Sequence, residues 1–155
     1  DTGGSSSGSG VASSVNFAVA TVGSETAGSI LSPAAANSVV GLKPTIGMLS
    51  RTGIVPISST LDTPGPITKN VVDTGIMMSA MFGNDTGDAA SLKTDFDKYW
   101  FTNYFVSEEM PFENKSFGVY KELLKDTLYY NAVELLKKKG AKIFELENKE
   151  VKLKI

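Results

Sequence analysis

Glycine is distributed very unevenly along this chain, and this distribution limits the folds that are open to it. Residues 1–90 contain 13 of the 15 glycines but only nine charged side chains, whereas residues 91–155 contain 23 charged side chains. Glycine permits tight turns and close backbone contacts that other residues exclude. We therefore expect a first region of closely packed backbone and a second, more polar region, with the boundary in the turn-rich stretch 82–95.

Composition limits the chemistry that the chain can perform. Its 155 residues, 41% of them hydrophobic, are enough for a globular core. A net charge of −2 gives no general attraction to nucleic acid or to an anionic membrane, so we expect neither as a partner. Cysteine and histidine are absent, which excludes disulfides and a Ser-His-Asp triad. Acid–base chemistry has to use Lys, Asp, Glu, Tyr or Ser, and we expect no metal site and no cofactor.

In the first region the hydrophobic pattern predicts helices and strands in alternation. In chain order, we expect a helix at 9–20, a strand at 19–25, a helix at 32–38, a strand at 39–44 and a helix at 68–83. The first helix would carry an apolar stripe formed by Val11, Val15, Ala18 and Val19. Asn70 and Asp73 have the spacing of a capping box at the start of the last helix, and Gly83 suits its end.

The second region has the pattern of a strand–helix–strand unit. We expect a loop at 108–116, a strand at 116–120, a helix at 126–140 and a strand at 141–146. The apolar face of this helix would consist of Leu128, Ala132, Leu135 and Leu136. Its end carries Lys137, Lys138 and Lys139, a favourable place for cations, and Gly140 follows as its cap. Such a unit is typical of an α/β fold.

Two stretches of small residues carry the functional prediction. GGSSSGSG occupies residues 3–10 and GSETAGS occupies residues 23–29, with a helix and a strand predicted between them. The chain can therefore fold back and bring both loops together. Backbone N–H groups of such a loop can bind an oxyanion, and a serine at its end, Ser29, is placed to attack the carbonyl carbon.

Three other interpretations of these stretches are open. By composition alone, residues 1–10 resemble a flexible linker. Both stretches are also compatible with tight turns that have only a structural role. A phosphate-binding loop is the third, but the pattern GxxxxGK followed by Ser or Thr is absent and no lysine lies near either loop.

The order of several blocks points to one family. GGSSSGSG, GSETAGSI, GLKPT and SSTLDTPGP follow one another at the spacing of the amidase signature family, over residues 3–88. Residues 115–146 resemble the next part of that family more loosely, and the blocks look closest to its peptide-amidase-like bacterial branch. The resemblance implies an α/β fold with a mixed sheet flanked by helices. It divides this chain into a signature core with the nucleophile loop at 1–90 and a charged continuation of the fold at 91–155.

The resemblance also implies a Ser–Ser–Lys mechanism, which a chain without histidine can support. Ser29 falls on the nucleophile and Ser5 on the bridging serine, which follows a cis peptide bond in the family. Ser6 falls on a supporting position. The implied oxyanion donors are the backbone N–H groups of Thr26, Ala27 and Gly28, with that of Ser29 as a further candidate.

The catalytic lysine of the family lies well upstream of the first loop, so no lysine of this chain matches it. Lys43, in GLKPT, matches a block with a structural role. We therefore expect an N-terminally truncated part of a longer enzyme, without the upstream and downstream parts, that is inactive alone and prone to self-associate. Leu31 stands where many members carry Arg, which favours neutral or apolar substrates over carboxylates.

The resulting hypothesis is an amidase that hydrolyses a small-molecule or peptide amide, and we expect it in the cytoplasm. One alternative is a non-catalytic relative or scaffold that binds a partner through residues 91–155. Another is an amidotransferase A-type subunit, which should carry Arg at the position of Leu31.

Overall fold

The computed structural model describes residues 1–91, 99–103 and 112–147. Its contacts divide the chain into two compact units, Asp1–Val106 and Ser107–Ile155. This division lies later than the compositional boundary. Helix α4 (Trp100–Asn103) packs against helix α3 (Val71–Met81), so it belongs to the first unit although its sequence lies beyond the glycine-rich region.

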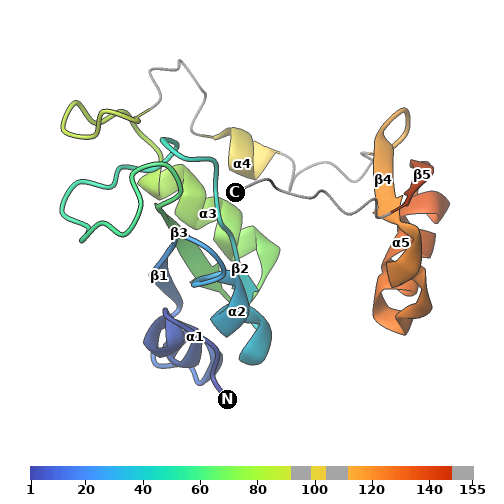
Figure 1. Cartoon of the computed structure of the whole chain (residues 1–155), viewed down its shortest axis with the longest axis horizontal. Helices are drawn as coiled ribbons and strands as arrows, with labels where there is room; N and C mark the ends of the chain where they lie inside the picture. Colours follow the sequence, from blue (N-terminus) through green and yellow to red (C-terminus); the bar gives the residue numbers. More distant parts are fainter. Residues whose placement is uncertain (92–98, 104–111, 148–155) are drawn as a thin grey trace. The chain divides into compact units, whose positions relative to one another are not determined.

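The first unit is a small antiparallel sheet with helices packed on it (Figure 1). The strand order is β1-β3-β2. Besides α3 and α4, its elements are α1 (Ser7–Ser14), β1 (Ala20–Glu25), α2 (Leu31–Ala36), β2 (Val40–Gly41) and β3 (Thr63–Thr68). Helix α1 packs against β1 and β3, α2 against β2, and α3 against β3. The α/β class is thereby confirmed.

The central strand β3 was not predicted from the sequence. Its sequence, TPGPIT, contains two prolines, which normally exclude a central position. The hydrogen bond from the Leu42 N–H to the Pro66 carbonyl (3.1 Å) shows that Pro66 faces the β2 side, where pairing extends over only two residues of β2. The ring nitrogens of Pro64 and Pro66 therefore point away from β1, and the full β1–β3 ladder forms without interruption.

The first predicted helix is wrong beyond Ser14. Helix α1 covers Ser7–Ser14, and Asn16 adopts a left-handed backbone with φ of 66°. The N–H groups of Phe17 and Ala18 both donate to the Ala12 carbonyl, which ends the helix. Consequently the expected apolar stripe does not form, and Val19 is 84% exposed.

The core of the first unit lies directly beside the second small-residue loop. Ile30, Ala34 and Ile67 are buried together, with Val39 packed against them. Ile30 follows Ser29 in the chain and is completely buried, so the core fixes the backbone next to the serine. The strand β3 approaches β2 closely because Gly65 has no side chain, and its position faces the Leu42 carbonyl.

Helix α3 begins as its sequence predicts. The Asn70 side chain accepts a hydrogen bond from the Asp73 N–H at 2.9 Å, and its amide donates to the Asp73 carboxylate at 2.8 Å. The N-cap role of Asn70 is therefore confirmed, while Asp73 returns its bond to the Asn70 side chain in place of the backbone N–H of a capping box. The helix ends at Met81, so Gly83 lies just beyond its Phe82 cap.

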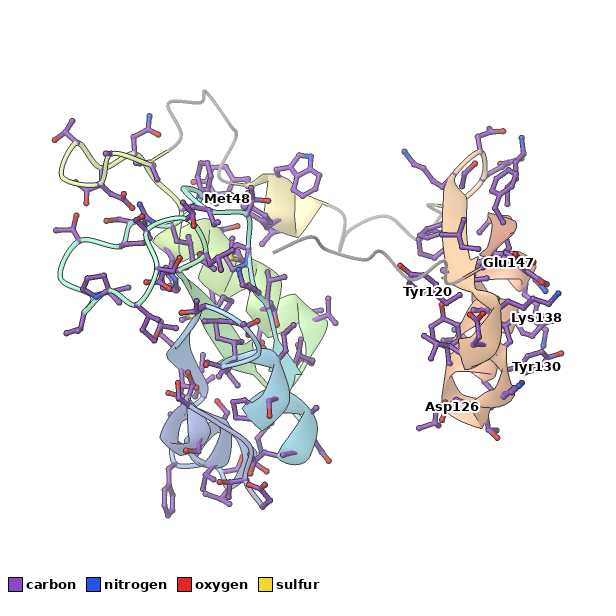
Figure 2. The ribbon with its side chains drawn as sticks, viewed as in Figure 1. Met48, Tyr120, Asp126, Tyr130, Lys138 and Glu147 are labelled. Carbon is purple, nitrogen blue, oxygen red and sulfur yellow. The ribbon has the colours of Figure 1, made fainter. Side chains whose placement is uncertain are left out.

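The second unit confirms the strand–helix–strand prediction. It contains β4 (Ser116–Tyr120), the 3₁₀ helix η2 (Lys121–Lys125), α5 (Thr127–Lys138) and β5 (Lys142–Leu146), and the two strands pair in parallel. Asp126 caps the start of α5 through the Tyr129 N–H, and Lys138 lies at its other end (Figure 2). Gly140 has a φ of 89°, as expected for the residue that stops the helix. Of the predicted loop 108–116, residues 108–111 lie outside the described residues, whereas residues 112–115 form the turn that precedes β4, as expected.

The predicted inner face of α5 is wrong. Leu128 is 80% exposed and Leu135 is 56% exposed, whereas Val133 is buried. The helix carries a second apolar stripe that includes Tyr129, Val133 and Leu136, and this is the stripe that turns inward in the unit. Sequence periodicity detected an amphipathic helix but did not distinguish between two neighbouring stripes.

We predict that Gly65→Ala destabilises the first unit by about 2 to 3 kcal/mol, because added side-chain volume in a packed interior forces the backbone apart. A Cβ at this position would lie 2.0 Å from the Leu42 carbonyl oxygen. Gly83→Ala is the matched control, since its Cβ would meet no atom within 4 Å. Urea unfolding of both variants measures the difference, and equal midpoints would contradict the role of this close contact.

Candidate active site

The two small-residue loops lie against each other, as their spacing predicts. The Ser6 N–H donates to the Ser29 carbonyl at 3.0 Å. The Ser6 hydroxyl also joins the first loop to strand β1, because it donates to the Ser24 carbonyl at 3.3 Å and accepts from the Ser24 N–H at 3.2 Å. A side chain at Gly23 would lie 2.8 Å from this hydroxyl. Residues 3–10 are therefore an ordered part of the fold and not a linker.

Ser5 and Ser29 line the same pocket. The peptide bond between Gly4 and Ser5 is cis, which confirms the geometry implied by the family resemblance. The pocket also has an apolar side, to which Ile54, Val55 and Ile57 contribute. Among the residues that the structure describes, no lysine lines this pocket.

A buried carboxylate shapes the loop that carries Ser29. Glu25 is only 3% exposed, and its carboxylate accepts hydrogen bonds from three backbone N–H groups. Gly28 donates to Oε1 at 2.7 Å, while Ile30 and Leu31 donate to Oε2 at 2.7 Å and 2.9 Å. The loop therefore wraps around one side chain.

The three N–H groups also keep Glu25 ionised. Burial alone would raise the pKa of Glu25, but the bonds from Leu31, Gly28 and Ile30 outweigh it, and the pKa lies below its ordinary value of 4.5. The turn itself depends on Gly28, whose φ is 90°. Ala27 stays outside the left-handed region, so the alanine at this position adds no strain.

This arrangement changes the expected set of oxyanion donors. The Gly28 N–H is occupied by Glu25, so it does not point to the pocket as the sequence suggested. Within residues 1–91, the N–H groups of Thr26, Ala27 and Ser29 have no hydrogen-bond partner. Thr26 and Ser29 also line the pocket, which leaves these N–H groups as candidate donors.

Asp62 is a second acidic residue at the site. Its Oδ1 accepts a hydrogen bond of 2.5 Å from the Thr26 hydroxyl, and its Oδ2 accepts from the N–H groups of Ile57 (2.7 Å) and Ser58 (2.8 Å). The bond from Thr26 is the main cause that lowers the pKa of Asp62. Neither Glu25 nor Asp62 was singled out in the sequence, although both stand inside the quoted blocks, as the acidic letters of GSETAGS and SSTLDTPGP.

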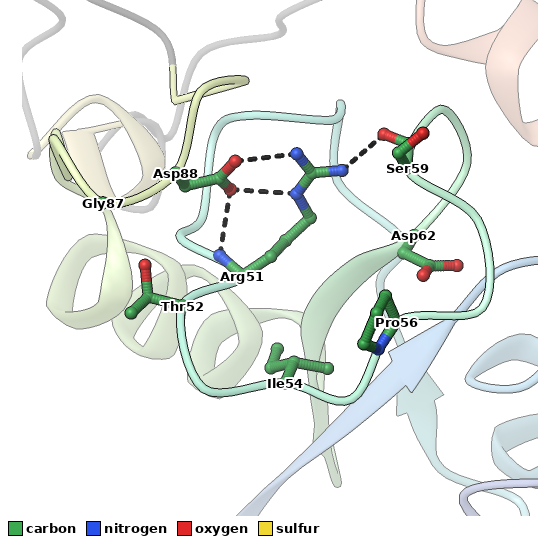
Figure 3. A pocket seen from close by; sticks show the side chains of 8 residues that line it. All are labelled: Arg51, Thr52, Ile54, Pro56, Ser59, Asp62, Gly87 and Asp88. Atoms are coloured by element: carbon green, nitrogen blue, oxygen red, sulfur yellow. Dashed lines mark hydrogen bonds and ion pairs between the residues drawn. The ribbon is translucent and has the colours of Figure 1, made fainter.

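A neighbouring pocket shares Arg51, Ile54 and Asp62 with the first (Figure 3). The Arg51 guanidinium donates to both carboxylate oxygens of Asp88, at 2.9 Å and 2.7 Å, and to the Ser59 carbonyl at 2.6 Å. This ion pair with Arg51 is the main cause of the lowered pKa of Asp88. Arg51 therefore links Asp88, in the loop after α3, to the loop 51–62, which contributes residues to both pockets.

Two further residues from the sequence analysis lie away from the reacting groups. The Lys43 ammonium donates to the Leu61 carbonyl at 3.1 Å, which fits the structural role expected for it. Leu31 is 47% exposed, and only its backbone N–H takes part in the Glu25 cluster.

The fold and these loops define the class of the protein. Residues 1–155 match the Amidase family, so the chain belongs to that family and the resemblance is confirmed. The chain is 39% identical over 154 residues to a putative amidase of Arthroderma benhamiae, covering 94% of this chain and 26% of that protein. It is also 39% identical over 150 residues to the A-type subunit of the glutamyl-tRNA(Gln) amidotransferase of Ruminiclostridium cellulolyticum, covering 92% of this chain and 30% of that protein.

Solved structures agree with this assignment. The native peptide amidase of Stenotrophomonas maltophilia has a TM-score of 0.81 and 38% identity, over 95% of this chain and 31% of that one. The corresponding amidotransferase subunit of Thermotoga maritima has a TM-score of 0.80 and 38% identity, over 94% of this chain and 32% of that one. The chain thus spans about 30% of the length of the curated relatives it matches.

Two kinds of feature are missing from the part of the chain that the structure describes. No helix there is both long and apolar enough to cross a membrane. In the same residues, no group of three or more acidic side chains is arranged to hold a metal ion.

We predict that Glu25→Gln lowers the free energy of unfolding by about 2 kcal/mol, because the amide nitrogen cannot accept and leaves a buried N–H unpaired. The pKa of Glu25 is lowered on folding, so its stabilisation is present above the ordinary pKa of 4.5 and is lost as the pH falls below it. The gap between wild type and variant should therefore shrink in acid. Urea unfolding at about pH 7 and about pH 4 measures it. A gap that does not change with pH would contradict the assignment.

Proposed function

We propose that the protein containing this chain is an amidase that hydrolyses a carboxylic or C-terminal peptide amide through an acyl-enzyme on Ser29. The observation that carries the proposal is the shared pocket, which Ser5 and Ser29 both line and beside which the N–H groups of the Ser29 loop have no partner within residues 1–91. A nucleophile, a second hydroxyl and oxyanion donors are the components that acyl transfer requires.

The proposed steps follow from this arrangement. Ser5 takes the proton from the Ser29 hydroxyl and passes it to a neutral lysine, and Ser29 Oγ attacks the amide carbon. The N–H groups of Thr26, Ala27 and Ser29 stabilise the oxyanion. The leaving amine or ammonia receives the proton, and water then hydrolyses the ester at Ser29.

The lysine has to come from outside this chain, as the resemblance implies. Within residues 1–91, no lysine lines the pocket of Ser5 and Ser29, and the Lys43 ammonium donates to the Leu61 carbonyl. Ser6 supports this assembly by holding the first loop on β1 through Ser24.

The substrate is proposed to be neutral near the scissile bond. Leu31 carries no charge where many family members carry Arg, and the Arg51 guanidinium that lines the pocket is already paired with Asp88. Ile54, Val55 and Ile57 give the pocket an apolar side. A C-terminal peptide amide or a small carboxylic amide fits these surroundings.

We also propose that the protein is cytoplasmic. A chain without cysteine is compatible with that location.

The amidotransferase relatives support a second candidate, an A-type subunit that releases ammonia for transfer. Identity does not separate the two, since this chain is 38% identical to both the peptide amidase and the Thermotoga maritima protein. Leu31 in place of the Arg expected for such an amidotransferase favours the hydrolase. The non-catalytic alternative explains neither the serine pair nor the unpartnered N–H groups.

We predict that a fluorophosphonate labels Ser29 in the full-length protein that contains this chain, because only an activated serine reacts with this probe at an appreciable rate. Peptide mass spectrometry identifies the labelled residue, and Ser29→Ala should abolish labelling. The 155-residue chain alone is expected to show no amide turnover. Labelling of another serine, or none in a folded protein, would contradict the proposed function.

The same assay tests the bridging role of Ser5. Ser5→Ala should slow labelling by about a hundredfold or more, as expected for loss of a proton-transfer group. Ser9→Ala is the matched control, because Ser9 lies four residues on, in helix α1, and its hydroxyl donates to the Val22 carbonyl at 2.8 Å, outside the pocket lining. Equal effects of the two substitutions would assign Ser5 a structural role.

A further inference from the structure

We propose that Asp62 is a positioning residue for the oxyanion site, acting through the Thr26 side chain. The carboxylate holds the Thr26 hydroxyl so that the Thr26 backbone N–H faces the substrate carbonyl. The inference rests on the proposed function, and it assigns a role to two residues whose side chains do not take part in proton transfer.

Thr26 has an anchored side chain and an available backbone N–H. Its hydroxyl donates to Asp62 Oδ1 at 2.5 Å, while its backbone N–H has no partner within residues 1–91. The side chain is therefore anchored and the N–H is left available. Because the Cα joins the two, an anchored side chain restricts rotation of the N–H that precedes it. Oxyanion donors are effective only when their orientation is fixed before the reaction.

The Asp62 carboxylate is itself held in a fixed position. Its other oxygen, Oδ2, accepts from the N–H groups of Ile57 and Ser58 at 2.7 Å and 2.8 Å, so the carboxylate cannot turn without losing two bonds. The residue is buried, at 9% exposure. The Thr26 hydrogen bond and the nearby Arg51 charge both favour its ionised form, which accepts hydrogen bonds most strongly.

The same carboxylate joins two parts of the pocket that are far apart in the sequence. Thr26 belongs to the loop of Ser29, and Ile57 belongs to the apolar side of the pocket. One side chain therefore sets the distance between the oxyanion donors and the surface against which the substrate would lie. A change of this distance by about 1 Å is enough to reduce a rate about a hundredfold.

The chain offers a matched control for a purely structural hydroxyl–carboxylate bond. The Thr52 hydroxyl donates to Asp85 Oδ2 at 2.5 Å, and Asp85 also accepts from the Gly87 N–H at 2.7 Å. This pair has the same chemistry and length as Thr26 and Asp62, but neither residue lines the pocket of Ser29. Thr52→Val therefore removes a bond of the same kind away from the pocket of Ser29, although Asp85 Oδ2 keeps a second hydroxyl donor, that of Ser50 at 2.5 Å.

The experiment is a double-mutant cycle in the full-length protein that contains this chain. The measured quantities are the rate of Ser29 modification by a fluorophosphonate, whose phosphoryl oxygen occupies the oxyanion site, and the urea midpoint. Thr26→Val and Asp62→Ala should each slow modification by about tenfold to a hundredfold, the range for a misplaced group. The double variant should be no slower than the slower single variant, since both act through one bond.

Two substitutions separate positioning from stability. Thr26→Ser keeps the hydroxyl and should stay within about threefold of wild type, since its bond to the carboxylate is retained. Thr52→Val also removes a hydroxyl–carboxylate bond and should leave the rate of modification unchanged, whatever its effect on the urea midpoint. If Asp62→Ala does not fold, the comparison of Thr26→Val with Thr26→Ser and Thr52→Val carries the test alone.

The outcomes distinguish this inference from the proposed function. Additive losses in the double variant, or a Thr26→Val protein as reactive as wild type, would overturn the positioning role while leaving an active serine hydrolase. Absence of any Ser29 modification in the folded wild type would instead contradict the proposed function itself. A slow Thr26→Val, a normal Thr26→Ser and a non-additive cycle would support the role of Asp62.

Discussion

The arrangement of the site depends on one buried carboxylate. Glu25 stands at the end of strand β1 and accepts three backbone N–H groups from the residues on either side of Ser29. A charged group in a buried position is stable only with such compensation. Because the compensation comes from the loop, the carboxylate fixes its turn and determines which N–H groups remain for a ligand. Gly28 is excluded by this bond, and Thr26, Ala27 and Ser29 remain.

Close backbone contacts allow the loop around Glu25 and Ser29 to lie beside the loop of Ser5. Gly23 leaves room for the Ser6 hydroxyl on β1, and Gly65 leaves room for the Leu42 carbonyl beside β3. At these two positions the fold requires glycine because a Cβ would collide with a neighbouring atom. The close contacts bring Ser5 and Ser29, 24 positions apart in the chain, into one pocket without a large hydrophobic core between them. The second unit is a compact body of its own, with α5 and a pair of parallel strands.

Local signals in the sequence predicted the elements that depend on local interactions. The cap of α3 at Asn70 and the strand–helix–strand unit at 116–146 were both found in this way. Strand β3 was missed because its prolines are tolerated only through their orientation relative to β2, which is a tertiary fact. The inner face of α5 was missed for a similar reason, since two apolar stripes compete and packing against the sheet selects the one with Val133.

The same distinction applies to the site. The motifs identified Ser5 and Ser29, and their spacing predicted that the loops would meet. The roles of Glu25 and Asp62 depend on where their oxygens point, and the partner of Asp62, Thr26, lies 36 positions away. No periodicity or spacing rule reports a bond of that kind. Sequence reasoning also assigned the Gly28 N–H to the oxyanion because small residues allow that orientation, whereas Glu25 imposes another.

The most direct test of this account is a crystal structure of the full-length protein with a phosphonate bound to Ser29. The account predicts that the phosphoryl oxygen lies about 3 Å from the backbone nitrogens of Thr26, Ala27 and Ser29, the usual distance for oxyanion donors. Glu25 should still hold the Gly28 N–H in that complex. A phosphoryl oxygen bonded to Gly28, with Glu25 displaced, would contradict the account.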